Sequence, residues 1–325
     1  MKRASCLTAV FLCLLMMSGC SKADSGDMTV TIGYFPNITH AQALVMKEQG
    51  NLDMAANGAF TTRWMDFNSG SAESLSLIAG DVDIGFIGPG PAIMTYLKSN
   101  KEFVVLCGVS DYGAALIAGK EAVITGVADL ANYTVAVPGI GNTQHICLLK
   151  LLEEVNLAST EEGGNVHVVA AENADILMLL NNGDVDAAFV PEPWVTQMEE
   201  QIGARVVADY DEVWKEGNYP SAMVITSKTF IREHPDVVDV FLKQLKEVTE
   251  QIDNDEESAA VMVSDSIYQI SGQQYDVGQL MKSFARMELT TEQVSYEAME
   301  IFARIAAEQE LIEGQIDESI LWQGD

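Results

Sequence analysis

The sequence GDVDIGFI at residues 80–87 recurs as GDVDAAFV at residues 183–190. In both copies an apolar pattern of helical spacing precedes the glycine, and glycine is the residue expected just past the last turn of a helix. The residues after the second aspartate are mostly apolar, which is typical of a strand buried on both faces. Each strand candidate then enters a proline-containing loop, at residues 88–91 and 191–194. The chain therefore carries one helix–strand–loop unit twice.

The similarity between the two copies extends upstream. Residues 30–35 are predicted to form a strand that leads through residues 36–40 into a helix, and residues 133–137 form the matching strand, followed by residues 138–141 and a helix. Alternating strands and helices predict an α/β fold with mostly parallel sheets. Ligands of such sheets bind beyond the carboxyl ends of the strands. Two units that face each other with these four loops would enclose a cleft.

The rest of the chain is predicted to complete the two units. A strand at residues 103–108 leads into residues 109–112, and residues 204–208 and 222–226 are further strand candidates. Four helical patterns follow at residues 236–248, 256–268, 277–287 and 290–309. This tail lacks strands, so we expect it to return to the first unit. The predicted lobes are residues 28–111 with 220–325, and residues 112–219.

Several polar residues have the spacing of helix caps. Thr39 with Gln42 and Thr290 with Gln293 match the capping box. Asn142 or Thr143 is expected to cap the helix in the second copy.

The N-terminus predicts export and lipid attachment. Basic Lys2 and Arg3 precede an apolar run at residues 7–17, which is shorter than the roughly 20 residues of a membrane span. The run closes on Met-Ser-Gly-Cys, ending at Cys20, which resembles a bacterial lipobox. We therefore predict a signal peptide at residues 1–19, a lipid on Cys20 and a flexible tether at residues 20–27. The alternative is an ordinary cleaved signal with an incidental cysteine.

Charge and cysteine content exclude several classes of protein. The chain has 48 acidic and 18 basic residues, a formal net charge of −30. An acidic surface repels nucleic acid phosphates and anionic lipid headgroups. Beyond the first 20 residues only Cys107 and Cys147 remain, and their apolar surroundings favour two buried thiols over a disulfide. No paired-cysteine spacing indicates a metal site.

Four segments of the chain carry a family resemblance, at residues 33–41, 80–91, 130–157 and 183–194. There the sequence resembles the solute-binding proteins of ABC importers for nitrate, sulfonates and taurine, whose relatives bind pyrimidine precursors of thiamine. The resemblance implies a two-lobed, type II periplasmic-binding-protein fold with a hinge. It implies a monomer that delivers a small solute to a permease and its ATPase, with no cofactor. The expected location is the outer side of the cell membrane, facing the periplasm or the cell exterior.

Polar residues at two predicted helix starts are candidates for anion binding. Free amides and the positive end of the helix dipole favour an anion there, and side-chain donors add direction. One cap needs only one such residue, whereas several stand at each start. The candidates are Asn37, Thr39, His40, Asn142, Thr143, Gln144 and His145.

The remaining site candidates follow other predicted strands. Gly88, Pro89 and Gly90 form a loop in which glycine lets the backbone approach a ligand. Ser110 and Asp111 lie where the chain is expected to cross between the lobes.

Two candidates in the second proline-containing loop have open roles. Glu192 could accept from an ammonium group or a ring amine, or it could make an interlobe contact. Trp194 could stack on a flat ligand or fill the core.

The motifs argue against an enzyme. The sequence has no activated-serine elbow, Walker loop or His-Glu metal motif. Gly139-Ile140-Gly141 resembles part of a dinucleotide fingerprint, but Gln144 stands where the third glycine belongs. Enzymes of this fold work in the cytoplasm, in conflict with an exported lipoprotein.

The leading ligand is a small anion such as a sulfonate, nitrate or taurine. Because Glu192 would repel a bare anion, a zwitterion or a neutral pyrimidine stays open. An enzyme of the same fold and a lipoprotein sensor or adhesin are the alternatives from other classes.

Overall fold

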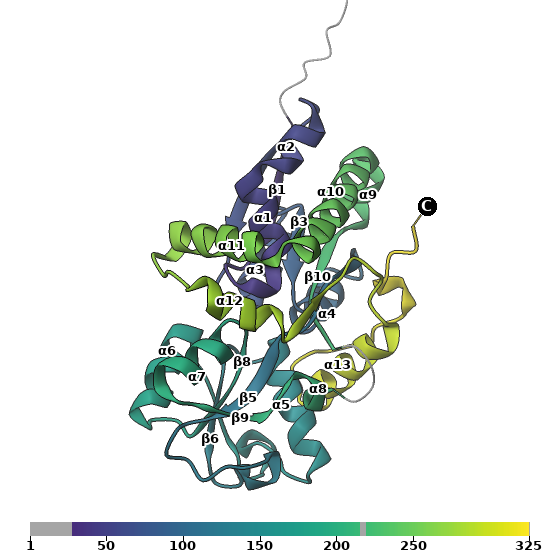
Figure 1. Ribbon diagram of the computed structural model, residues 1–325. Helices are drawn as coiled ribbons and strands as arrows, with labels where there is room; N and C mark the ends of the chain where they lie inside the picture. The colour runs from purple at the N-terminus through teal and green to yellow at the C-terminus, as the bar shows by residue number, and fades with distance from the viewer. Residues whose placement is uncertain (1–27, 215–218, 325) are drawn as a thin grey trace, which may run out of the picture.

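The computed structural model describes residues 28–214 and 219–324. These residues form two β-sheets with helices packed on them, one sheet in the upper half and one in the lower half of Figure 1. The predicted signal peptide, the lipid on Cys20 and the tether lie outside the described residues. Within these residues no helix has the length and apolarity needed to cross a membrane.

The first sheet has the strand order β11-β4-β10-β3-β1-β2. Its parallel part comes from the first copy of the repeat, because β1 pairs in parallel with both β2 and β3. The other strands run antiparallel to their neighbours. The bounds are β1 Thr29–Tyr34, β2 Thr61–Asp66, β3 Ile84–Ile87, β4 Phe103–Tyr112, β10 Pro220–Ser227 and β11 Met287–Leu289.

The second sheet repeats this plan with the order β7-β6-β8-β5-β9. Strand β6 pairs in parallel with β7 and β8, and β5 runs antiparallel to β8 and β9. The bounds are β5 Ala114–Ala118, β6 Thr134–Val137, β7 His167–Ala170, β8 Ala187–Pro191 and β9 Arg205–Ala208. Both sheets are therefore mixed, and the duplicated units supply their parallel strands.

The second aspartate of each GDVD motif ties its strand to the neighbouring one. The Thr31 amide donates to Asp83 Oδ2 at 2.7 Å, and the Thr134 amide donates to Asp186 Oδ2 at 2.8 Å. Each aspartate amide donates in return to the carbonyl of the same threonine. The repeat in the sequence is thus a repeated local structure.

Thirteen α-helices pack around the sheets in the described residues. Helices α1, α10 and α11 pack together over one face of the first sheet, where Phe86 and Phe241 make an edge-to-face contact. A second apolar core continues from the first sheet to the second. The helices are α1 Ala41–Gln49, α2 Asn51–Ala56, α3 Gly70–Ala79, α4 Pro89–Lys98, α5 Thr143–Glu154, α6 Asn173–Asn182, α7 Trp194–Ile202, α8 Tyr210–Val213, α9 Lys228–Glu233, α10 Pro235–Asn254, α11 Glu256–Ser271, α12 Val277–Phe284 and α13 Tyr296–Glu308.

The C-terminal tail differs from the sequence prediction. It contains strand β11, which pairs with β4, so α12 ends at Phe284 rather than at Met287. Helix α13 begins at Tyr296, where Ser295 caps it by accepting from the Ala298 amide. The helix also reaches beyond the first unit, since it packs against both α4 and α5.

Neither predicted capping box forms. Thr290 Oγ1 accepts from the Glu292 amide within a turn that precedes the helix. Thr39 Oγ1 donates to Asn37 Oδ1, while Gln42 Nε2 donates to the Val109 carbonyl in β4. Gln42 therefore bonds a partner far away in the sequence instead of the backbone at the start of its own helix.

The chain crosses from the first sheet to the second between β4 and β5, and it returns between β9 and β10. These crossings support lobe boundaries near residues 112 and 219, which we keep as a proposal. Cys107 and Cys147 are both buried and free.

Candidate functional site

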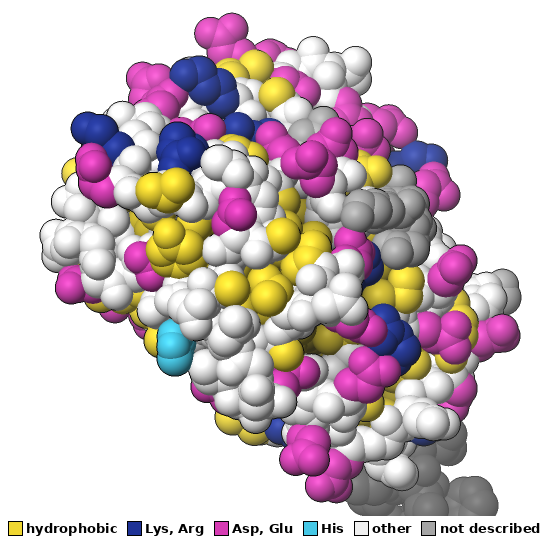
Figure 2. All heavy atoms as spheres, turned by 90° about the horizontal axis from the view of Figure 1, so that it is seen from below, with side chains coloured by type: hydrophobic (Ala, Val, Ile, Leu, Met, Phe, Trp, Pro, Cys, Tyr) yellow, Lys and Arg dark blue, Asp and Glu magenta, His cyan; other side chains and the backbone are white. Residues whose placement is uncertain are grey.

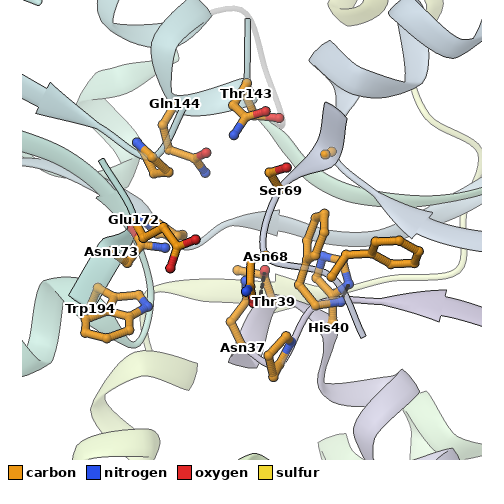
Figure 3. Close-up of a pocket in the computed structure, with 18 of the residues that line it drawn as sticks. Asn37, Thr39, His40, Asn68, Ser69, Thr143, Gln144, Glu172, Asn173 and Trp194 are labelled. Atoms are coloured by element: carbon orange, nitrogen blue, oxygen red, sulfur yellow. Dashed lines mark hydrogen bonds between the residues drawn. The ribbon is translucent and has the colours of Figure 1, made fainter. Parts of the chain in front are cut away.

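A cavity of about 310 Å³ lies between the two sheets (Figure 3). Its walls include the segments that follow β1, β2 and β3 in the first sheet and β6, β7 and β8 in the second. All six are parallel strands, so the cavity lies where parallel sheets bind ligands. The segment between α11 and α12 adds Gln273 and Tyr275.

Many of the predicted site residues meet at this cavity. They come from both halves of the molecule, as the duplication suggests. Those in the lining are Asn37, Thr39, His40, Gly88, Asn142, Thr143, Gln144 and Trp194.

The other predicted residues lie outside the lining. Pro89 and Gly90 open α4, and Asp111 stands in β4 opposite Glu288. Ser110 donates to the Thr39 carbonyl at 3.0 Å, so it supports the site from behind.

The N-terminal end of α5 lines the cavity with groups that can hold an anion. Asn142 occupies the N-cap position but makes no side-chain cap, and the first amide with an intrahelical partner is that of Ile146. The amides of residues 143–145 therefore belong to the helix start, where the dipole is positive. Thr143 and Gln144 add a hydroxyl and an amide group from the same turn. This arrangement suits a small oxyanion.

Gly88 allows the two halves to approach each other at this point. A Cβ atom at Gly88 would lie 2.3 Å from Thr143 Oγ1, which is closer than any real contact. Gly88 is the N-cap of α4 and Thr143 opens α5. A glycine here therefore brings the starts of two helices together at the cavity.

The two histidines near the site hold the backbone instead of carrying charge. His40 Nδ1 accepts from the Phe35 amide, and His145 Nδ1 accepts from the Gly141 amide. Burial lowers the pKa of His40 to about 3 and that of His145 to about 4. Both rings are therefore neutral at neutral pH and leave the cavity without a histidine cation.

Glu192 lies in an interlobe network and not in the cavity lining. Its carboxylate is fully buried and accepts from the Thr196 amide and hydroxyl, from Ser283 Oγ at 2.9 Å and from Arg286 Nη1 at 3.1 Å. Burial raises the pKa of Glu192, and these hydrogen bonds and the Arg286 charge offset part of that rise. Because Ser283 and Arg286 come from the C-terminal tail, the geometry favours an interlobe contact for Glu192 over direct contact with a ligand.

Sequence reasoning missed several residues of the lining. The segments after β2 and β7 follow strands that the sequence prediction does not contain, although the rule for parallel strands applies to them as well. Gln273 and Tyr275 come from a connection between two helices that no sequence pattern marks. The missed polar residues are Asn68, Ser69, Glu172, Asn173, Ser271, Gln273 and Tyr275.

The two sheets and the cavity between their strand ends define a periplasmic-binding-protein fold, and solved structures agree. The periplasmic aliphatic sulphonate-binding protein of Escherichia coli superimposes with a TM-score of 0.77 at 19% identity, over 91% of this chain and 92% of that one. The periplasmic nitrate-binding protein of Synechocystis PCC 6803 gives a TM-score of 0.69 at 14% identity, over 87% and 81%.

The model of the NMT1-like family matches residues 23–264, so the chain belongs to the NMT1-like family. The taurine-binding periplasmic protein of Escherichia coli (strain K12) is 29% identical over 217 residues. That match covers 66% of this chain and 64% of the relative, which is slightly less than two thirds of the relative's length.

Proposed function

We propose that this protein is the solute-binding component of an ABC importer and captures a small sulfonate-class solute, anionic or zwitterionic, in the cavity. The observation that carries the proposal is the start of α5, with its amides and the polar groups of Thr143 and Gln144. The relatives named for sulfonate, taurine and nitrate binding support the same class of ligand.

The lining chemistry fits an oxyanion that is held by neutral donors. The described lining residues include no lysine or arginine. Oriented backbone amides can take the place of a basic side chain in binding an anion. They bear the partial positive charge of the helix dipole, and unlike lysine or arginine they need no counter-charge. A cavity of about 310 Å³ matches a solute of a few heavy atoms rather than a polymer.

The proposed route of delivery rests on the N-terminal sequence. A signal peptide at residues 1–19 would export the chain, and a lipid on Cys20 would hold it at the membrane beside a permease and its ATPase. We propose a monomer without catalytic activity, and an acidic protein that does not bind nucleic acid. On the face shown in Figure 2, acidic side chains clearly outnumber basic ones.

The test is a thermal unfolding screen of the mature chain with sulfonates, nitrate, taurine and pyrimidines. A ligand at about 100 times its Kd should raise the free energy of unfolding by about 2.7 kcal/mol. A rise in Tm with a sulfonate-class solute supports the proposal. No rise with any sulfonate-class solute, or a rise with pyrimidines alone, contradicts the ligand class.

A further inference from the structure

Glu172 is the single charged side chain among the described residues that line the cavity, given that His40 is neutral. In Figure 3 its carboxylate points into the cavity, between Gln144 on one side and Trp194 on the other. A bare anion would meet this carboxylate with no basic side chain in the lining to balance it. The charge of the lining therefore favours a ligand that carries a positive group as well.

The internal repeat shows that Glu172 is not needed as a helix cap. Ser69 is the N-cap of α3 in the first copy, and its Oγ accepts from the Ala72 amide. Glu172 holds the same place before α6 in the second copy, but its side chain makes no cap. Within residues 28–214 and 219–324 it also has no side-chain hydrogen bond or ion pair. Serine is a preferred cap and glutamate is not, so the local structure does not explain this residue.

Trp194 lines the same cavity as Glu172. An ammonium group carries three N–H donors, and a tryptophan ring can attract a cation through its π-face. Asn173 also lines the cavity, but its Oδ1 atom is buried, so a ligand in the cavity does not reach that atom. An ammonium group in the cavity would therefore pair with the Glu172 carboxylate.

We propose that the cavity binds a zwitterion, with its acid group at the start of α5 and its ammonium group at the Glu172 carboxylate. This inference rests on the proposed function and narrows its solute class to short aminoalkanesulfonates. The two groups of the site lie on the same side of the cavity, because α5 and α6 follow the neighbouring parallel strands β6 and β7 of the second sheet (Figure 3). This arrangement suits a short ligand. Glu192 has no part in this recognition, since its carboxylate is occupied in the interlobe network.

The test compares two sulfonates that differ only at the amino end. Taurine and 1-propanesulfonate have the same chain length, with an ammonium group in one and a methyl group in the other. Isothermal titration calorimetry of the mature chain, residues 20–325, should show at least about tenfold tighter binding of taurine, the difference that a charged hydrogen bond produces. Glu172→Gln should remove that preference and leave the affinity for 1-propanesulfonate unchanged or higher.

Asp175→Asn is the matched control, because Asp175 is an exposed acid in the first turn of α6 outside the cavity lining. It should leave both affinities within about twofold, which separates a local contact from a general change in charge. Equal affinity of the wild-type chain for the two sulfonates, or full taurine affinity in Glu172→Gln, overturns the ammonium subsite but not the proposed function. Failure of both sulfonates to bind the wild-type chain overturns both proposals.

Discussion

Thr143 is the residue whose hydroxyl most directly serves the proposed anion. It opens α5, lines the cavity and touches Gly88 across it. Thr143→Ala removes one donor to a charged group, a loss of about 1.5–3 kcal/mol. We therefore expect roughly tenfold to hundredfold weaker sulfonate binding by calorimetry. Ser71→Ala, on the exposed side of α3 outside the lining, should bind as the wild type does. Equal affinity in both variants would remove Thr143 from the site.

Glu73 is a fully buried acid in the first turn of α3, and neither carboxyl oxygen has a partner in the described residues. Two paired glycines make room for it, since a Cβ atom would come within 2.5 Å of Glu73 Oε1 at Gly33 and within 2.9 Å at Gly85. Its counterpart in the second copy is the buried Ile176. Burial raises the pKa of Glu73 well above its usual value of 4.5.

This raised pKa predicts how stability depends on pH. Above pH 4.5 the unfolded chain loses the Glu73 proton while the folded chain keeps it, so the free energy of unfolding falls as the pH rises. Glu73→Gln has no titrating group at this position, so it should gain stability relative to the wild type as the pH rises above 4.5. The measurement is Tm as a function of pH. A constant difference in Tm would show that Glu73 titrates normally.

At the scale of elements, the hydrogen bonds that Asp83 and Asp186 accept from neighbouring strands should contribute equally to the free energy of unfolding in the two copies. Asp83→Ala and Asp186→Ala each remove a charged acceptor from a strand amide, so each should lower the free energy of unfolding by about 1.5–3 kcal/mol. Asp81→Ala and Asp184→Ala are matched controls on the exposed aspartate of each motif, expected within about 0.5 kcal/mol. Denaturant titration measures all four, and equal losses at tied and exposed positions would contradict this role.

The strength of the sequence prediction also varies by element. The duplicated strands and the loop at Asn142 and Thr143 could be predicted because periodicity and strand order are local signals. Strand β11 could not, since its three residues become a strand only by pairing with β4. Glu172 could not be predicted because it follows β7, a four-residue strand that the sequence prediction does not contain. The partners of Glu192 were invisible because Ser283 and Arg286 are about 90 residues away along the chain.

At the scale of the whole molecule, α7 of the second half packs against α12 of the C-terminal tail (Figure 1). Arg286 bonds the buried Glu192 and also Glu199 at 2.8 Å, and the Arg286 carbonyl accepts from the Gly113 amide at the crossing between the sheets. This network therefore joins the tail, the second sheet and the crossing segment. Ligand binding that changes the lobe arrangement must act on these contacts.

Arg286→Met leaves Glu192 buried beside an uncharged side chain. Removing one partner of a buried pair costs roughly 3–5 kcal/mol, so we expect a loss of that order in the free energy of unfolding. Lys282→Met is the control, because the Lys282 pair with Glu200 is largely exposed and should contribute at most about 1 kcal/mol. Denaturant unfolding separates the two, and equal effects would contradict a buried interlobe network.

The most direct measurement is a crystal structure of the mature chain grown with taurine. We expect the sulfonate at the amides of residues 143–145 and the ammonium group at the Glu172 carboxylate. A ligand found outside this cavity, or bound with its two ends reversed, would contradict the proposed mode of binding.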